Sequence, residues 1–135
     1  MKTSIFPQCM FEPEEDYYIL TIIVPVYNEA DNLIRLEKEL LEYLKMASVP
    51  TKVLLVNDGS NDNSQELIDT ICYRNTAFSY ILFNQNYGLS SAIKAGFDVV
   101  NTELTGYIDA DLQTSPNDFN LLLEHITDNE LVTGV

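Results

Sequence analysis

The stretch YILTIIVPV at residues 18–26 decides the fold class, because it is apolar almost throughout and rich in β-branched residues. Such a run predicts a strand that is buried on both faces, as in the parallel sheets of α/β proteins. Residues 30–45 follow, and their leucines fall at helical spacing to form one apolar stripe: Leu33, Leu36, Leu40, Leu41 and Leu44. A buried strand followed directly by an amphipathic helix predicts a parallel strand–helix unit.

The same alternation continues along the chain. Further strands are predicted at residues 52–56, 79–83 and 105–108, with the start of another at 130–135. Helices are predicted at residues 62–72, 90–100 and 117–126. Asp62 is the expected N-cap of the first of these, with Gln65 in capping-box spacing. The pattern predicts an α/β, Rossmann-like fold with a mostly parallel sheet, right-handed crossovers and helices on both faces.

The length, the net charge and the number of cysteines exclude several classes of function. With 135 residues, 46% of them hydrophobic, the chain is one domain with a core. The 21 acidic against 7 basic residues give a net charge of −14, and such a surface repels phosphate backbones, which excludes nucleic acid as a general partner. Two cysteines, Cys9 and Cys72, are too few for a disulfide scaffold or a zinc site, which favours free thiols in a reducing compartment.

Residues 1–16 are predicted to be an acidic leader, either a solvated tail or an edge segment, and residues 17–135 to be the folded domain. The leader lacks the apolar block of a signal peptide, and the chain has no run of about 18 apolar residues to span a membrane. We therefore expect a cytoplasmic protein, with any place at the inner face of the plasma membrane depending on segments beyond Val135.

Polar residues gather just after the predicted strands, at Asn28, Glu29, Asn57, Asp58, Asn84, Asn86, Asp109 and Asp111. The carboxyl ends of parallel strands meet at one edge of a sheet, and this edge is where open α/β sheets bind ligands. The sequence therefore predicts a ligand site there.

The sharpest of these segments is YIDADLQTSP at residues 107–116. Asp109 and Asp111 follow a strand end, where the turning chain can bring both carboxylates to one point, and Gln113 would add a neutral oxygen. Hard cations such as Mg²⁺ take carboxylate oxygens and share their site with substrate phosphates. Two solvated aspartates in an acidic loop are the alternative.

Two further segments supply candidates for nucleoside binding. In VNDGS, Asp58 would accept N–H donors from a nucleobase, unless it only forms an Asp-Gly turn that caps the next helix. In PVYNE, Pro25 closes the strand, Tyr27 offers a ring for stacking, and Glu29 stands at a helix start, where the helix dipole favours it. Neither a Walker motif nor a G-x-G-x-x-G loop is present to bind phosphate.

In the segment NYGLSSAIKAG, residues 86–96, Gly88 and Gly96 frame a helix of small residues that permits close approach to a strand or a ligand. Lys94, the last basic residue in the chain, is either a nucleotide contact or a plain surface lysine. His125, the only histidine, is predicted near a helix end, far from the strand ends, which argues against a nucleophilic triad.

These four segments, in this order, resemble the inverting family 2 glycosyltransferases over residues 21–135. The sequences of these segments are most similar to those of the subgroup that transfers hexoses to polyprenyl phosphate, the enzymes like dolichol-phosphate mannose synthase. The resemblance implies the GT-A nucleotide-diphospho-sugar transferase fold, of which this chain would hold the N-terminal half. It implies a nucleotide site with Asp58 on the base, formed by Pro25, Tyr27, Glu29, Asp58, Lys94 and Asp109. It also implies a Mg²⁺ or Mn²⁺ site formed by Asp111, Gln113 and Asp109.

The chain departs from the family pattern in places. Asn57 replaces the commoner aspartate beside Asp58, and Gln85 stands where relatives often carry arginine. The family's catalytic domain also runs longer than this chain, so we expect the acceptor-side catalytic residues beyond Val135 and an isolated chain that is inactive. Uncovered apolar faces near the C-terminus are expected to give an exposed patch or self-association through that edge.

The function implied by the resemblance is transfer of a hexose from a nucleotide-diphosphate sugar, UDP rather than GDP, to polyprenyl phosphate by metal-assisted inverting displacement. A soluble transferase that builds glycan on a sugar hydroxyl, and a non-catalytic nucleotide-sugar-binding module, are the alternatives. A nucleotidyltransferase should carry a glycine-rich basic loop near its first strand, and PVYNEADN is not one.

Overall fold

The computed structural model describes residues 3–6, 17–111, 115–116 and 118–124. This part contains, in chain order, β1 (Thr3–Phe6), β2 (Leu20–Val26), α1 (Ala30–Met46), β3 (Thr51–Asn57), α2 (Ser64–Arg74), β4 (Phe78–Phe83), α3 (Leu89–Val99), β5 (Leu104–Tyr107) and α4 (Asp118–Leu123). The strands and helices predicted from residue 18 to residue 126 are all present, and the strand predicted at residues 130–135 lies outside the described residues. None of the described helices is both long and apolar enough to span a lipid bilayer.

The strands form one sheet in the order β1-β4-β3-β2-β5. β2 pairs in parallel with β3 and with β5, and β3 pairs in parallel with β4. The predicted mostly parallel sheet is therefore confirmed. The exception is β1, which pairs antiparallel with β4 at an edge of the sheet. Residues 3–6 of the predicted leader thus form an edge strand rather than part of a solvated tail. This strand forms hydrogen bonds with backbone groups of β4 that would otherwise be unpaired at the sheet edge.

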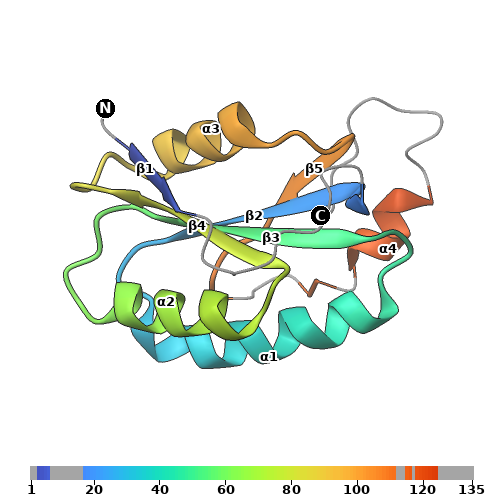
Figure 1. Ribbon diagram of the computed structural model, residues 1–135, viewed down its shortest axis with the longest axis horizontal. Coiled ribbons are helices and arrows are strands. Elements are labelled where there is room, and N and C mark those ends of the chain that lie inside the picture. Colours follow the sequence, from blue (N-terminus) through green and yellow to red (C-terminus); the bar gives the residue numbers. More distant parts are fainter. Residues whose placement is uncertain (1–2, 7–16, 112–114, 117, 125–135) are drawn as a thin grey trace.

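Helices cover both faces of the sheet, as predicted: α1, α2 and α4 lie on one face, and α3 lies on the other (Figure 1). β2 shows how the sequence requires this. Ile22, Val24 and Val26 join the core that α1 and α2 share, whereas Ile23 joins the core beneath α3. Because successive side chains of a strand point to opposite faces, a strand between two helix layers is apolar at every position.

The stripe predicted on α1 is buried unevenly. Leu33, Leu36 and Leu40 are fully buried, whereas Leu41 and Leu44 pack at the margin of the same core. Burying one such side chain stabilises the fold by roughly 2 kcal/mol. This stripe holds the long helix flat against the sheet and fixes where its N-terminus lies.

α3 approaches the sheet closely, as its small residues predict. A Cβ atom on Gly96 would lie only 2.7 Å from Ile23 Cδ1, and Ala92 and Ala95 are buried at the same interface. A larger side chain at these positions would push α3 away from the sheet. The small residues therefore set the position of the first turn of α3.

Candidate functional site

A cleft of about 280 Å³ opens at the carboxyl edge of the sheet. Its lining comes from the ends of β2, β3, β4 and β5: Pro25, Val26, Tyr27, Glu29, Asp58, Asn86, Gly88, Leu89, Asp109, Ala110 and Asp111. The structure thus brings together Pro25, Tyr27, Glu29, Asp58, Asp109 and Asp111 from the sequence-predicted set. They meet because parallel strands deliver their following loops to the same edge. The volume is near the lower end of the range for small-molecule sites.

The loops after β2 and β3 are joined by hydrogen bonds. The Asn28 backbone N–H donates to Ser60 Oγ at 3.0 Å, and the Asn61 backbone N–H donates to Asn28 Oδ1 at 2.7 Å. Asn28 has a φ of 53°, a left-handed conformation that asparagine tolerates better than most residues. This reciprocal pair fixes the path of the chain between Tyr27 and Glu29, two residues of the cleft lining.

The N-terminus of α1 is capped by residues from the next loop. The Glu29 N–H donates to Ser64 Oγ at 3.1 Å, and the Ala30 N–H donates to Asp62 Oδ2 at 3.3 Å. Asp62 Oδ1 also accepts from the Ser64 N–H at 2.9 Å, so one carboxylate serves the first turns of both α1 and α2. Slight burial acts to raise the pKa of Asp62, but the hydrogen bonds from Ser64 and Ala30 outweigh it and hold that pKa below its ordinary value.

The predicted capping box at α2 is wrong. The helix begins at Ser64 and its N-cap is Asn63, although the Ser64 N–H does donate to Asp62. Gln65, however, does not reach back to it: Gln65 Oε1 accepts from Asn57 Nδ2 at 2.9 Å, and Gln65 Nε2 donates to Asp69 Oδ1 at 2.9 Å. The amide of Asn57 at the end of β3 competes for the glutamine.

Asp58 is a buried carboxylate, with only 3% of its surface exposed. Its Oδ1 accepts from the Tyr87 backbone N–H at 2.7 Å, and its Oδ2 accepts from the Gly88 N–H at 3.0 Å and from Asn86 Nδ2 at 3.1 Å. Asp58 therefore does more than form an Asp-Gly turn. The sequence left open that Asp58 only caps the helix that follows, but it is Asp62 that accepts from the first residue of that helix. Asp58 also borders the cleft, where contact with a base stays a prediction.

Gly59 forms the tight turn that the sequence predicts, with a φ of 68°. A Cβ atom at this position would lie 2.2 Å from the backbone carbonyl carbon of Gln85. The turn after β3 therefore packs directly against the backbone that follows β4, and only glycine, which has no Cβ atom, fits at this position.

Asp109 and Asp111 both line the cleft, on either side of the buried Ala110. Asp109 is exposed and Asp111 is half-buried, whereas Gln113 lies outside the described residues. Among the described residues, no three histidine, cysteine, aspartate or glutamate side chains gather closely enough to hold a metal alone. Two carboxylates at an open edge do fit Mg²⁺ or Mn²⁺, because such ions take oxygen ligands and complete their shell with water and substrate phosphates.

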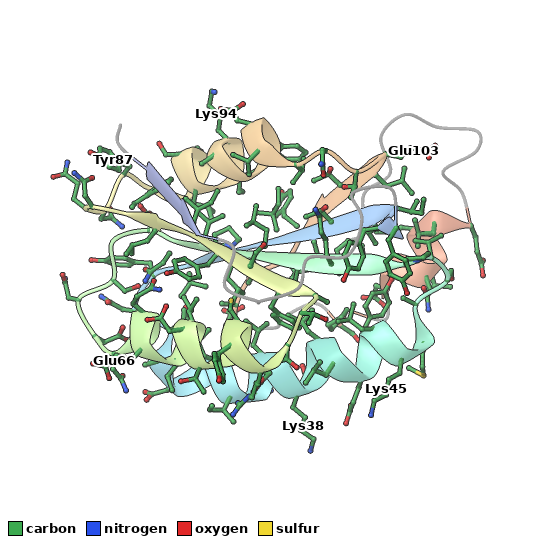
Figure 2. The ribbon with its side chains drawn as sticks, in the orientation of Figure 1. Lys38, Lys45, Glu66, Tyr87, Lys94 and Glu103 are labelled. Atoms are coloured by element: carbon green, nitrogen blue, oxygen red, sulfur yellow. The ribbon has the colours of Figure 1, made fainter. Side chains whose placement is uncertain are left out.

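Lys94 does not belong to this cleft. Its side chain projects from the outward face of α3 (Figure 2), and Lys94 Nζ pairs with Asp98 Oδ2 at 2.7 Å. The helical period explains this position, because Ala92, Ala95 and Gly96 face the sheet and Lys94 falls on the opposite side. Lys94 is thus in a surface ion pair outside the lining, and its contact with a nucleotide stays a prediction. None of the described residues that line the cleft is a lysine or an arginine.

Asn86, Gly88 and Leu89 also line the cleft, although none of them was predicted to belong to the nucleotide site. The sequence places Asn86 after a strand and Gly88 before a helix. The signal was present, since Leu89 opens α3 directly after the loop from β4 and so has to lie at the same sheet edge. Its exposed side chain, 56% accessible, is apolar lining beside the carboxylates.

Comparison with known proteins assigns the family. The model of glycosyl transferase family 2 matches residues 21–135. The chain belongs to glycosyl transferase family 2. The resemblance carried by the four sequence segments is confirmed.

The curated relatives of this family 2 chain that are described next are named undecaprenyl-phosphate sugar transferases. The undecaprenyl-phosphate 4-deoxy-4-formamido-L-arabinose transferase of Yersinia enterocolitica is 38% identical over 118 residues, which cover 85% of this chain and 36% of the relative. The protein of the same name from Serratia proteamaculans is 34% identical over 116 residues, again covering 85% of this chain and 36% of the relative. This chain thus spans about a third of the length of these relatives.

Solved structures confirm the fold class. The mannosyltransferase PcManGT from Pyrobaculum calidifontis, in complex with GDP-Man and Mn²⁺, matches with a TM-score of 0.66 at 21% identity, over 88% of this chain and 35% of that chain. S. aureus TarS in complex with UDP-GlcNAc matches with a TM-score of 0.59 at 21% identity, over 69% of this chain and 26% of that chain. At such identities the likeness concerns the fold alone, here that of GT-A transferases.

Proposed function

We propose that the cleft binds the nucleoside diphosphate of a sugar donor and that the protein transfers the sugar to a polyprenyl phosphate. The names of the curated relatives support this class of acceptor. Their sugar is an arabinose derivative, so we widen the expected hexose to a hexose or a pentose. For the nucleotide we propose UDP rather than GDP.

One observation carries the proposal: an aromatic ring and several carboxylates from separate strand ends line one cleft, and no lysine or arginine is among the described residues that line it. The ring of Tyr27, 44% exposed, is available for stacking on a nucleobase. Glu29 and Asp58 lie in the same lining and would accept hydrogen bonds from the nucleoside. A binding surface of this kind suits the nucleoside, but it repels a diphosphate unless a cation is present.

Asp109 and Asp111 are the residues that would hold that cation, Mg²⁺ or Mn²⁺, with Gln113 as a further predicted ligand. When bound, the ion would neutralise the negative charge that gathers on the departing diphosphate. The contribution of the chain itself is to keep two carboxylates at the open side of the cleft, within the same lining as the nucleoside-facing residues.

The acceptor determines what else the reaction needs. In an inverting displacement the acceptor oxygen bonds to the anomeric carbon while the bond from that carbon to the nucleoside diphosphate breaks. A polyprenyl phosphate is already anionic and needs no general base, whereas a sugar hydroxyl has to lose its proton to one. We expect the groups that position the acceptor to lie beyond Val135, so the isolated chain is expected to bind nucleotide weakly and to transfer no sugar.

The binding experiment compares UDP with GDP, each in Mn²⁺ and in EDTA. We expect UDP to bind more tightly than GDP and only when the ion is present. Equal UDP affinity in EDTA and in Mn²⁺ would remove the metal from the proposal, and tighter GDP binding would reverse the choice of nucleotide.

The transfer experiment uses the chain and a version extended past Val135, with UDP-sugars and either a polyprenyl phosphate or a glycan acceptor. Transfer to the lipid phosphate by the extended chain supports the proposal. Transfer only to a sugar hydroxyl favours the soluble glycan-building enzyme, and nucleotide binding without any transfer favours the non-catalytic module. Equal rates for the two chains would show that the catalytic unit ends before Val135.

A further inference from the structure

Asp58 occupies an unusual position for a residue that is expected to face a ligand. Its carboxylate is almost wholly buried, and its backbone N–H donates to Val26 O at 2.8 Å, which ties the residue to the end of β2. A buried carboxylate is unfavourable unless hydrogen bonds compensate for lost water. In this protein the compensating donors come from a different loop, that of residues 86–88.

Two consecutive backbone N–H groups and one side chain supply those donors. Tyr87 and Gly88 donate through the backbone, one to each carboxylate oxygen, and Asn86 donates through its side-chain amide. Asn86 Nδ2 also approaches the Asp58 carbonyl oxygen at 3.3 Å. Hydrogen bonds to an ionised acceptor are stronger than neutral ones. The segment from Asn86 to Gly88 therefore takes its position from Asp58.

This segment forms one wall of the cleft. Asn86, Gly88 and Leu89 all belong to the lining, and Gly88 is the N-cap of α3. We infer that Asp58 is also a positioning residue, which acts on a bound nucleotide through this wall in addition to its own contact with the base. The inference rests on the proposed nucleotide site. It gives the carboxylate a role that exists before any ligand arrives.

The first test needs no nucleotide. Amide hydrogen exchange is measured on the wild-type chain and on the Asp58→Asn variant. The asparagine side chain has one acceptor oxygen, and its NH₂ group would face the second of the two backbone N–H donors, with which it cannot form a hydrogen bond. Exchange at Tyr87 and Gly88 should become at least about tenfold faster, because each amide loses a bond to a charged acceptor. Exchange at Val24 and Leu55, in the centre of the sheet, should stay slow.

Glu29→Gln is the matched control. It removes the same charge from the same cleft, but Glu29 Oε2 accepts its hydrogen bond from Asn32 Nδ2 in α1 rather than from the loop of residues 86–88. Exchange at Tyr87 and Gly88 should be unchanged in this variant. Unchanged exchange at both amides in a folded Asp58→Asn variant would overturn the inference, and so would an equal acceleration in the control.

A second measurement needs only the wild-type chain, so it can be made even if the Asp58→Asn variant does not fold. In the wild-type chain, scalar couplings across the hydrogen bonds should connect the Tyr87 and Gly88 amide nitrogens with the Asp58 carboxyl carbon. Their presence supports the inference. Their absence, in a spectrum that shows such couplings between strands of the sheet, would overturn it.

Nucleotide binding then separates positioning from direct base contact. UDP has a ring N–H at N3, and N3-methylated UDP lacks it. If Asp58 positions the wall, Asp58→Asn should weaken the binding of both nucleotides. If Asp58 acts by base contact alone, only the binding of UDP should weaken, and that result would overturn the inference. If neither nucleotide binds to any variant, the proposed function fails, while the exchange and coupling measurements still decide the role of Asp58.

Discussion

The two sides of the cleft are built differently. On one side, the loops after β2, β3 and β4 are joined by hydrogen bonds through Asn28, Ser60 and Asp58. On the other side, Asp109 is exposed and follows β5, whose residues are at most half-buried. The joined side has its shape before a ligand arrives, and such preorganisation reduces the entropy lost on binding. The β5 side offers charge and requires a cation or another group to balance it.

The largest effect is expected from a substitution on the joined side, Gly59→Ala. The new Cβ would collide with the Gln85 backbone, and the residue would hold a φ of 68° that alanine disfavours. The strain and the displacement together should lower the free energy of unfolding by about 3 kcal/mol. Urea unfolding followed by circular dichroism measures it.

Gly88→Ala is the control for this prediction. Gly88 has a φ of 103°, but no atom lies within 4 Å of an added Cβ, so only the backbone strain applies. Its loss should be about 1–2 kcal/mol. Equal losses in the two variants would show that the contact between the turn after β3 and the chain after β4 is not tight.

The second prediction concerns the β5 side: Asp109→Asn combined with Asp111→Asn. One close charge pair is worth about 4 kcal/mol at an effective dielectric constant of about 20, so Mn²⁺-dependent UDP affinity should fall by at least about 2 kcal/mol, or roughly thirtyfold. The free energy of unfolding should stay the same or rise slightly, because two like charges are removed. Calorimetry with and without Mn²⁺ measures the first effect, and a loss of stability above 1 kcal/mol would contradict this picture of the site.

The fold could be predicted from the sequence because its determinants are local. A strand between two helix layers is apolar at nearly every position, and residues 18–26 carry that pattern with Thr21 as the polar exception. The placement of the strand ends at one edge then follows from the parallel sheet. For the same reason, the site residues that directly follow strands, such as Tyr27 and Asp109, were predicted to lie together.

Hydrogen-bond partners could not be predicted in the same way. Asp58 and Gly88 are 30 residues apart, and no spacing rule pairs them. Gln65 has capping-box spacing, yet the amide of Asn57 takes its side-chain oxygen. The position of Lys94 is a different case, because helical periodicity relative to Gly96 places it on the side of α3 away from the sheet.

A smaller effect is expected from Tyr27→Ala, at the boundary between the two sides. The ring is 44% exposed, so its removal should change the free energy of unfolding little. Loss of stacking on a base should reduce UDP affinity by about 1–2 kcal/mol, or about tenfold. Tyr27→Phe keeps the ring and should bind UDP as the wild type does. A tenfold loss in the phenylalanine variant would assign the effect to the hydroxyl group instead.

The smallest effect is expected from Asp62→Ala, which removes the shared cap of α1 and α2 on the joined side. Loss of a capping carboxylate should lower the free energy of unfolding by about 1 kcal/mol at neutral pH. The folded protein holds the pKa of Asp62 below its ordinary value, so this stabilisation is present above about pH 4 and is lost as the pH falls through the folded-state value. The stability difference between wild type and variant should therefore shrink on acidification. Asp62→Asn keeps one of the two acceptor oxygens and should lose about half as much, with little dependence on pH. A difference that stays constant down to pH 2 would show that the charge of Asp62 has no part in joining the two loops.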